Sequence, residues 1–336
     1  MKKLLLLSAL LASFSLSAAP DDIGATEVAK WEGNTKACFL MMFDDGWPSA
    51  LVVAIPELEK RNLAATYFLV PEKGEYKVYE EKWKKVAGKP GVVFGVHTLT
   101  HHGIKDLEHG RHEIGDCAKY LRGIVPGKRT RLLAYGQPGV GQGKWNITGD
   151  EEKQLLKEFD LVDRPPFRDH GAVYHWQTCE QMLALADKAI ETGGMNYVIF
   201  HGLEIKDPKR TYQDFWAMKQ DIVFPFFDAI AERRDRGDLW VTDWISCHQY
   251  ETERATARVE NIAPGKKGIT LTLSCDADPA LYDLPLTLRT RVPKDWEKVS
   301  VTQGERTEQV DARDGVVQYH AIPDGTSVTL ARSAER

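Results

Sequence analysis

The chain has 336 residues, of which 43% are hydrophobic and 28% are charged, and its formal net charge is -5. This length and apolar content are sufficient for a full hydrophobic core and predict two domains. The charge balance lacks the basic excess of nucleic-acid-binding proteins, so we expect no nucleic-acid partner. The sequence leaves the oligomeric state open.

The N-terminal residues have the pattern of a secretory signal peptide. Lys2 and Lys3 precede the apolar run Leu4–Leu16, and the small residues Ser17–Ala19 follow it. This pattern predicts a signal peptide at 1–19 and an exported protein, either periplasmic or secreted. The apolar run is too short to span a bilayer and no later segment reaches spanning length, so we expect no integral membrane segment in the mature chain.

Short apolar runs alternate with longer amphipathic segments up to about residue 250. The short runs predict strands at Ala37–Phe43, Ala64–Val70, Val92–Val96, Arg131–Tyr135, Leu161–Asp163, Tyr197–Phe200 and Leu239–Thr242. The longer segments predict helices, among them Ser49–Arg61, Glu113–Gly123, Asp150–Phe159, Thr178–Glu191 and Tyr212–Arg234. Such alternation is typical of an α/β fold with a parallel sheet, open or closed into a barrel.

After residue 255 the helical periodicity disappears, and short strand-like runs are separated by turn signals such as Pro264-Gly265. These runs are Ile269–Leu273, Leu284–Arg291, Val299–Val301, Val316–His320 and Ser327–Leu330. They predict a small antiparallel, sandwich-like β domain. We therefore expect an α/β domain at 20–254 and an accessory β domain at 255–336.

Five cysteines are an odd number for an exported chain, and they show no CxxC motif or other metal-binding spacing. Cys38 lies in an apolar run and is expected to be a buried small hydrophobic residue. Disulfides among Cys117, Cys179, Cys247 and Cys275 are left open.

Polar side chains with catalytic potential follow the predicted strands at their carboxyl ends. They are Asp44 and Asp45 after the first strand, His97 and His101 after the third, Tyr135 at the end of the fourth, Asp163 and Arg164 after the fifth and His201 after the sixth. In a parallel α/β barrel the carboxyl ends of all strands lie on one face, where active sites form. This common position favours a catalytic interpretation over separate turns or solvated helix faces.

The two adjacent carboxylates and the two histidines four residues apart supply three ligands for a divalent metal. One carboxylate is then left to act as a base. Catalytic zinc sites use three protein ligands and an open position for water, and the metal makes that water a nucleophile near neutral pH. The motif therefore predicts metal-assisted hydrolysis. A second cluster, His109 and His112 with Glu108 and Glu113, opens a charged helix without completing HExxH and is not expected to bind metal.

Three motifs resemble those of the NodB-type polysaccharide deacetylases, carbohydrate esterase family 4. Met42–Gly46 resembles the family motif TFDDG, His97–His101 matches H-[ST]-x-x-H completely, and Ile199–His201 resembles Leu-x-His. The resemblance covers roughly residues 36 to 250. It implies a distorted (β/α) barrel, usually of seven strands, and a catalytic role for the predicted α/β domain.

The resemblance also implies a division of roles among the site residues. Asp45, His97 and His101 would hold the metal, most commonly Zn²⁺, with Co²⁺ or Ni²⁺ as alternatives. Asp44 would be the general base and His201 the general acid. The metal and the backbone N–H of Tyr135 would stabilise the oxyanion.

The third family motif, Arg-x-Pro-x-Gly, is altered here because Leu132 stands at the arginine position and Ala134 at the proline position. We predict that Arg164 replaces the missing arginine and orients Asp44 through its planar fork of donors. Asp163 is expected to hold Arg164 or to stabilise His201.

Together these features predict an exported, metal-dependent deacetylase of acetylated polysaccharide or oligosaccharide. The acetyl group is either N-linked, as in chitin or peptidoglycan, or O-linked, as in xylan. The alternative is a non-catalytic glycan-binding protein that retains the fold. Trp47, Trp145 and Trp176 are candidate sugar-stacking side chains.

Overall fold

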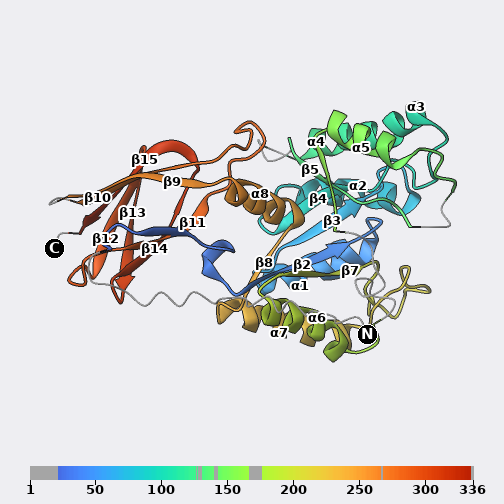
Figure 1. Ribbon diagram of the computed structural model, residues 1–336. Helices are drawn as coiled ribbons and strands as arrows, with labels where there is room; N and C mark the ends of the chain where they lie inside the picture. The colour runs from blue at the N-terminus through green and yellow to red at the C-terminus, as the bar shows by residue number, and fades with distance from the viewer. Residues whose placement is uncertain are drawn as a thin grey trace, which may run out of the picture.

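The computed structural model describes residues 22–125, 127, 131–139, 143–165, 176–265 and 268–333. The predicted signal peptide at 1–19 lies outside these residues. Within them, no helix combines the length and the apolar character that crossing a membrane requires. Figure 1 shows a parallel α/β part and an antiparallel β part, joined through a helix.

The α/β part is built on seven parallel strands. They are β2 (Ala37–Phe43), β3 (Ala65–Leu69), β4 (Val92–Val96), β5 (Leu133–Tyr135), β6 (Leu161–Asp163), β7 (Met195–Phe200) and β8 (Leu239–Thr242). Their order is β6-β5-β4-β3-β2-β7, and β8 also pairs with β2. Each of the seven predicted strands is present, and the predicted distorted barrel is confirmed.

The distortion of the barrel originates at β2, which has three parallel partners. Along one edge, Cys38–Phe43 pair with β7. The other edge is shared, because Ala37–Leu40 pair with β8 while Met42 and Phe43 pair with β3. A strand has only two edges, so β3 and β8 must diverge where they meet β2. All seven residues of β2 are buried, as expected of a strand covered on both faces.

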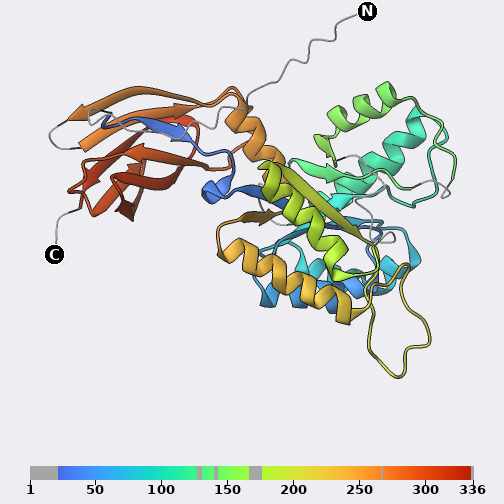
Figure 2. The same cartoon turned by 60° about the horizontal axis from the view of Figure 1, so that its bottom comes forward.

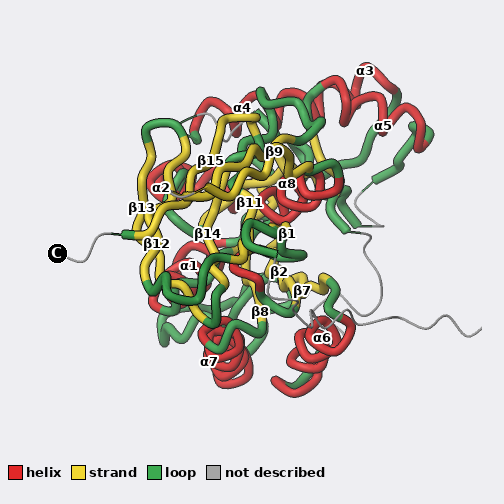
Figure 3. The backbone as a smooth tube through the Cα atoms, turned by 60° about the vertical axis from the view of Figure 1, so that its left-hand side comes forward, coloured by secondary structure: helices red, strands yellow, loops and turns green. Residues whose placement is uncertain are grey.

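Helices flank the parallel strands on both sides. They are α1 (Ile55–Lys60) with the preceding π-turn η2 (Ala50–Ala54), α2 (Gly74–Val86), α3 (Leu107–Gly110) continuing through η3 (Arg111–Asp116) into α4 (Cys117–Ile124), α5 (Gly149–Glu158), α6 (Cys179–Thr192), α7 (Gln220–Asp235) and α8 (Trp244–Ala255). Figure 3 shows α6 and α7 on one side of the strands and α3 and α5 on the other. Capping boxes at Thr148 and Thr178 fix the starts of α5 and α6.

The predicted helix Tyr212–Arg234 is wrong at its start. In the structure α7 begins at Gln220, and residues 201–219 form a loop between β7 and α7. The helices α2, α3 and α8 lie outside the helical ranges named from the sequence.

The β part is an eight-stranded antiparallel sheet with the order β1-β11-β14-β13-β12-β15-β10-β9. Its strands are β1 (Thr26–Val28), β9 (Arg258–Gly265), β10 (Gly268–Ser274), β11 (Leu286–Arg291), β12 (Lys298–Gln303), β13 (Arg306–Arg313), β14 (Val316–Ala321) and β15 (Asp324–Arg332). The N-terminal strand β1 pairs with β11, so it lies in this sheet although we predicted residues 20–254 to form the α/β domain. Strands β1, β9 and β13 were missed.

The helix α8 connects the two parts of the chain (Figure 1). Gln249 Nε2 donates to the carbonyl of Leu281 at 2.7 Å, and the Tyr250 hydroxyl donates to the carbonyl of Ala29 at 2.9 Å. All five cysteines are free. Cys38 is buried, as expected.

Glu253 in α8 makes the stability of this connection sensitive to pH. It is fully buried, its Oε1 accepts from the backbone N–H of Leu284, and its Oε2 has no partner among the described residues. Burial raises its pKa from 4.5 to about 8. Below pH 4.5 the carboxyl is neutral in both states, so its contribution is intact there and is lost as the pH rises through 8.

We therefore expect Glu253→Gln, which is neutral at every pH, to melt near the parent temperature at about pH 5 and above it at about pH 8.5, by roughly 2–4 °C. Thermal unfolding followed by circular dichroism at both pH values measures this difference. If the difference in melting temperature between variant and parent were the same at every pH, the raised pKa of Glu253 would be contradicted.

Candidate metal centre and active site

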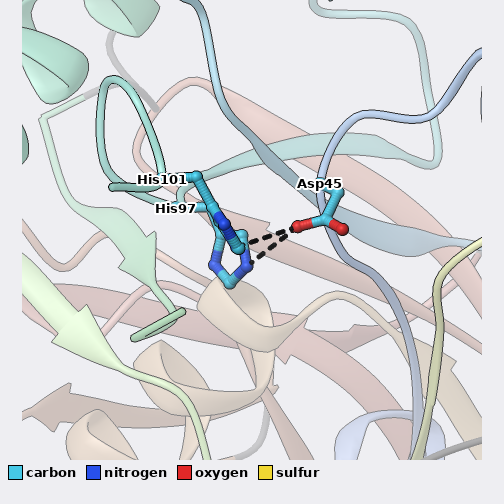
Figure 4. Close-up of side chains that lie close together, drawn as sticks. All are labelled: Asp45, His97 and His101. Carbon is cyan, nitrogen blue, oxygen red and sulfur yellow. Dashed lines mark ion pairs between the residues drawn. The ribbon is translucent and has the colours of Figure 1, made fainter. Parts of the chain in front are cut away.

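The predicted metal ligands converge from the carboxyl ends of two strands. Asp45 follows β2, whereas His97 and His101 follow β4, and β3 lies between these strands. Asp45 Oδ1 lies 3.4 Å from His97 Nε2 and 3.1 Å from His101 Nε2. Figure 4 shows these three side chains pointing toward one another. The ligand atoms of all three buried residues lie within 4.8 Å of one another. One divalent cation can therefore contact all three.

The hydrogen bonding of His97 indicates that these atoms meet around a cation. Its Nδ1 lies 2.6 Å from the carbonyl oxygen of Gly136, which can only accept, so Nδ1 carries the proton. In the neutral ring Nε2 then presents a lone pair toward Asp45 Oδ1. That oxygen is buried and accepts no hydrogen bond from the described residues. Two facing lone pairs repel each other unless a cation lies between them, so the residues present fit a divalent metal.

The second oxygen of Asp45 is held from the other side. Asp45 Oδ2 accepts from Trp47 Nε1 at 2.9 Å and lies 3.4 Å from Lys73 Nζ. The Lys73 ammonium also lies 4.1 Å from the centre of the Trp47 ring. Burial opposes ionisation of Asp45, but His101 and His97 when their rings are protonated, followed by Lys73, hold its pKa far below the ordinary value. Asp45 is thus an anionic ligand with one free oxygen.

Glu113 fixes the backbone of the loop that carries the histidines. It is 1% exposed, its Oε2 accepts from the N–H groups of Leu99 and Thr100 at 3.1 and 2.9 Å, and its Oε1 accepts from the Thr100 hydroxyl at 2.7 Å. Thr98 and His101 have φ angles of 63° and 66°, which are unfavourable for residues with a Cβ. The buried carboxylate stabilises this strained loop and so positions His101.

Glu113→Ala should weaken metal binding by about 10-fold or more, the usual effect of removing a group that orients metal ligands. Glu113→Gln should recover most of the affinity, because its amide oxygen can accept both N–H bonds while its NH₂ group donates to the Thr100 hydroxyl. Competition with a metal-binding dye measures the Kd of each variant. Parent affinity in a folded alanine variant would show that Glu113 does not position the loop.

Arg164 binds Asp44, the candidate base. Arg164 follows β6 and is 6% exposed, and its guanidinium donates to Asp44 Oδ1 at 2.5 Å. The guanidinium also lies 4.9 Å from the centre of the Phe68 ring. A Cβ at Gly136 would lie 3.0 Å from the guanidinium carbon, so glycine provides the space it occupies. Leu132, at the arginine position of the family motif, is buried in an apolar cluster.

The remaining contacts of Asp44 place it between two imidazoles. Its Oδ2 lies 4.0 Å from His97 Nε2 and 4.0 Å from His201 Nε2. Burial opposes its ionisation, but Arg164, His97 and His201 together hold its pKa below the ordinary value. Burial lowers the pKa of His201, although Asp44 partly offsets this effect. The carboxylate is therefore ionised near neutral pH and available as a base.

Arg164→Ala should lower turnover by roughly 10-fold or more, because a hydrogen bond to a charged group contributes about 1.5–3 kcal/mol. Metal content should change little, since the guanidinium donates to Asp44 Oδ1 and to the carbonyl of Gln137, neither of which belongs to a predicted metal ligand. Arg164→Lys should not restore turnover, because an ammonium lacks the planar fork. Steady-state kinetics with metal analysis tests this, and full activity in the lysine variant would reject an orienting role.

Tyr135 and Asp163 are the two remaining residues that the sequence places in the site. The hydroxyl of Tyr135 donates to Glu152 Oε1 at 2.9 Å, so the phenol is already bound, and a role for its backbone N–H stays a prediction. The Asp163 residue is exposed, and its carboxylate interacts with the backbone N–H of Arg164. A role for Asp163 in holding the Arg164 side chain or stabilising His201 stays a prediction.

Of the three predicted sugar-stacking tryptophans, Trp47 lies at the site. Trp145 and Trp176 are half-buried and pack against the core of the α/β part. Sequence reasoning missed Phe215 and Trp216, whose rings contact the candidate acid histidine.

A comparison with family models gives one match. A model described as Polysaccharide deacetylase matches residues 32–148, the segment that contains Asp44, Asp45, His97 and His101. Residues 32–148 are thus similar to polysaccharide deacetylases. The predicted resemblance is confirmed. Arg164 lies beyond the matched polysaccharide deacetylase segment.

Other similar proteins were found by sequence and by structure. Gellan lyase from Bacillus sp is 23% identical in an alignment 345 residues long, gaps included, which covers 94% of this chain and 14% of that protein. A carbohydrate esterase of family CE4 from Streptococcus mutans is 17% identical, with a TM-score of 0.42, over 62% of this chain and 87% of that chain.

Two further solved structures belong to proteins with contrasting descriptions. A family 4 carbohydrate esterase from Streptomyces lividans is 15% identical, with a TM-score of 0.40, over 60% of this chain and 90% of that chain. A CE4 family pseudoenzyme from Bacillus anthracis is 15% identical, with a TM-score of 0.42, over 63% of this chain and 64% of that chain.

Proposed function

We propose that this protein is a metal-dependent hydrolase that removes acetyl groups from an acetylated polysaccharide or oligosaccharide. The observation that carries the proposal is the convergence of Asp45, His97 and His101 within 4.8 Å, beside an ionised Asp44 that Arg164 holds. A binding protein requires neither a metal ligand set nor an oriented base next to it. The match to the polysaccharide deacetylase family supports the same chemistry.

Asp45, His97 and His101 would hold the cation, for which Zn²⁺ is our first choice because two imidazoles and one carboxylate are typical zinc ligands. When bound, the metal activates water and polarises the acyl carbonyl group. The contact between His97 Nδ1 and the Gly136 carbonyl fixes the ring orientation that this ligand set requires.

Asp44 takes the proton from the attacking water in the proposed reaction. Its Oδ1 is bound by Arg164, which leaves Oδ2 to accept the proton. His201 Nε2 lies 4.0 Å from Oδ2, and His201 donates a proton to the departing amine or hydroxyl. Arg164 holds Oδ1 and so fixes the orientation of the carboxylate for proton transfer.

The predicted export of the chain belongs to this proposal, because acetylated structural polysaccharides lie outside the cytoplasm. The acetyl linkage is tested by incubating the metal-loaded protein with N-acetylated chito-oligosaccharides and with O-acetylated xylo-oligosaccharides. Enzymatic measurement of free acetate then reports turnover for each class. Release from one class identifies the linkage, and release from neither would reject the proposed function in favour of glycan binding alone.

A further inference from the structure

The loop between β7 and α7 exposes an aromatic surface beside the candidate site. Figure 2 shows this loop, in yellow, projecting from the α/β part. Phe215 and Trp216 lie in it, and each is 43% exposed to solvent. Large apolar side chains that remain exposed next to a reactive centre are typical of ligand recognition.

The rings form a row that extends across the site. Phe215 stacks on Trp216 with ring centres 4.1 Å apart and planes inclined by 28°, and on Trp47 at 6.3 Å and 29°. The His201 ring meets Phe215 and Trp216 edge-on, at 5.6 and 4.8 Å. At its other end the row reaches the metal ligand Asp45 through Trp47 Nε1. A ligand lying on these rings is thus adjacent to the reacting groups.

Buried polar contacts hold the backbone of the loop that carries Phe215 and Trp216. Asp214 is 4% exposed and accepts from the Ser49 N–H at 2.7 Å and from Arg210 at 2.6 Å. The N–H of Gly202 donates to the Phe215 carbonyl at 2.9 Å, and a Cβ at Gly202 would lie 2.8 Å from that oxygen. These contacts mean that the loop needs little backbone ordering when a ligand binds.

We infer that Phe215 and Trp216, together with Trp47, form a subsite that binds a pyranose ring of the substrate glycan. A pyranose presents an apolar C–H face and a rim of hydroxyl groups, which suits flat rings bordered by polar groups. Lys73 Nζ lies over the Trp47 ring, so it covers one face of that ring and places a hydrogen-bond donor beside the row. The area of a few rings suits a sugar unit, whereas a stable protein interface involves about 20–30 residues on each side. This inference rests on the proposed function and assigns its sugar-binding residues.

The experiment measures glycan binding by the full-length, metal-loaded protein in an Asp44→Asn background, in which the substrate should not be consumed. The probes are tetra-N-acetylchitotetraose and acetylated xylotetraose, titrated by calorimetry. Phe215→Ala and Trp216→Ala should each weaken binding of the recognised probe by about 10-fold or more, as expected for aromatic anchor residues. Phe215→Leu and Trp216→Leu, which keep apolar volume but remove the ring, should show a similar loss.

Tyr212→Ala is the matched control, because Tyr212 is also exposed on this loop but its ring contacts Arg210 instead of His201. It should bind like the Asp44→Asn parent. In otherwise unmodified protein, Trp216→Ala should raise KM for the oligosaccharide far more than it lowers hydrolysis of p-nitrophenyl acetate, which has no sugar.

Parent-like binding in the folded Phe215 and Trp216 variants would overturn the subsite, and so would a parent protein that binds neither probe. The proposed function fails separately. If the protein binds glycan through these rings but releases no acetate, the subsite stands and the proposed activity fails. If the protein releases acetate while the Phe215 and Trp216 variants bind glycan like the parent, the activity stands and the subsite fails.

Discussion

Asp44→Asn should retain its metal and lose turnover by roughly 100-fold or more, the usual contribution of a positioned general base. The substitution keeps the size of the side chain and its hydrogen-bonding oxygen, but the amide cannot accept a proton from water. Asp45, which the structure groups with the histidines, is untouched. Metal analysis and acetate-release kinetics on the same preparation measure both quantities.

A matched control for this variant is Asp163→Asn, since Asp163 also follows a parallel strand but is exposed. It should turn over at close to the parent rate. Near-parent turnover in Asp44→Asn would show that Asp44 is structural and would contradict the mechanism. Loss of the metal from Asp44→Asn would instead make Asp44 a ligand.

His97→Ala should lose both metal and activity. Its Nε2 faces Asp45 Oδ1 at 3.4 Å, and the ring supplies one of only three protein ligands in the proposed site. With two ligands left, too few donors remain to hold the ion at an open site. Elemental analysis of the dialysed variant, compared with the parent, measures the loss.

His112→Ala is the matched control for the histidine substitution. His112 belongs to the second cluster, pairs with Asp116 at 2.7 Å and is largely exposed. It should keep parent metal content and activity. A full equivalent of tightly held metal in His97→Ala would reject the ligand assignment, even if that variant were inactive.

The parts of the fold that could be predicted are those encoded by neighbouring residues. Strands β2, β4, β6 and β8 have the bounds expected from sequence. For β2 the reason is that a strand buried on both faces is a continuous apolar run. Asp45 and His97 were found because they lie within two residues of the ends of β2 and β4. Arg164 was suggested by the arginine missing at Leu132, and the structure places it against Asp44.

The contacts that were not predicted depend on tertiary structure. Glu113 lies in a charged segment whose sequence is typical of a solvent-exposed helix. Its sequence neighbours do not show that its side chain is buried against the loop that carries the histidines. Lys73 and Trp47 are 26 positions apart, and only the fold places them together at Asp45. A single sequence does not show that a charged side chain is buried unless its hydrogen-bond or ion-pair partner is close to it in the sequence.

The errors in secondary structure have similar causes. The three-residue strand β1 pairs Thr26 with Thr290, a partner far along the chain that no local pattern reveals. Helix α2 buries only Tyr76 and Trp83, which is too narrow an apolar stripe to stand out among its charges. Residues 212–219 resemble a helix, but the buried Asp214 ties them to Ser49 as a loop.

The most direct test of the central claim is reversible removal of the metal. The parent protein is treated with a chelator, dialysed, and assayed for acetate release from the acetylated glycan that it cleaves, before and after addition of one equivalent of Zn²⁺, Co²⁺ or Ni²⁺. We expect activity to disappear with the metal and to return with one equivalent, while His97→Ala stays inactive under the same additions. Undiminished acetate release from demonstrably metal-free protein would contradict the account.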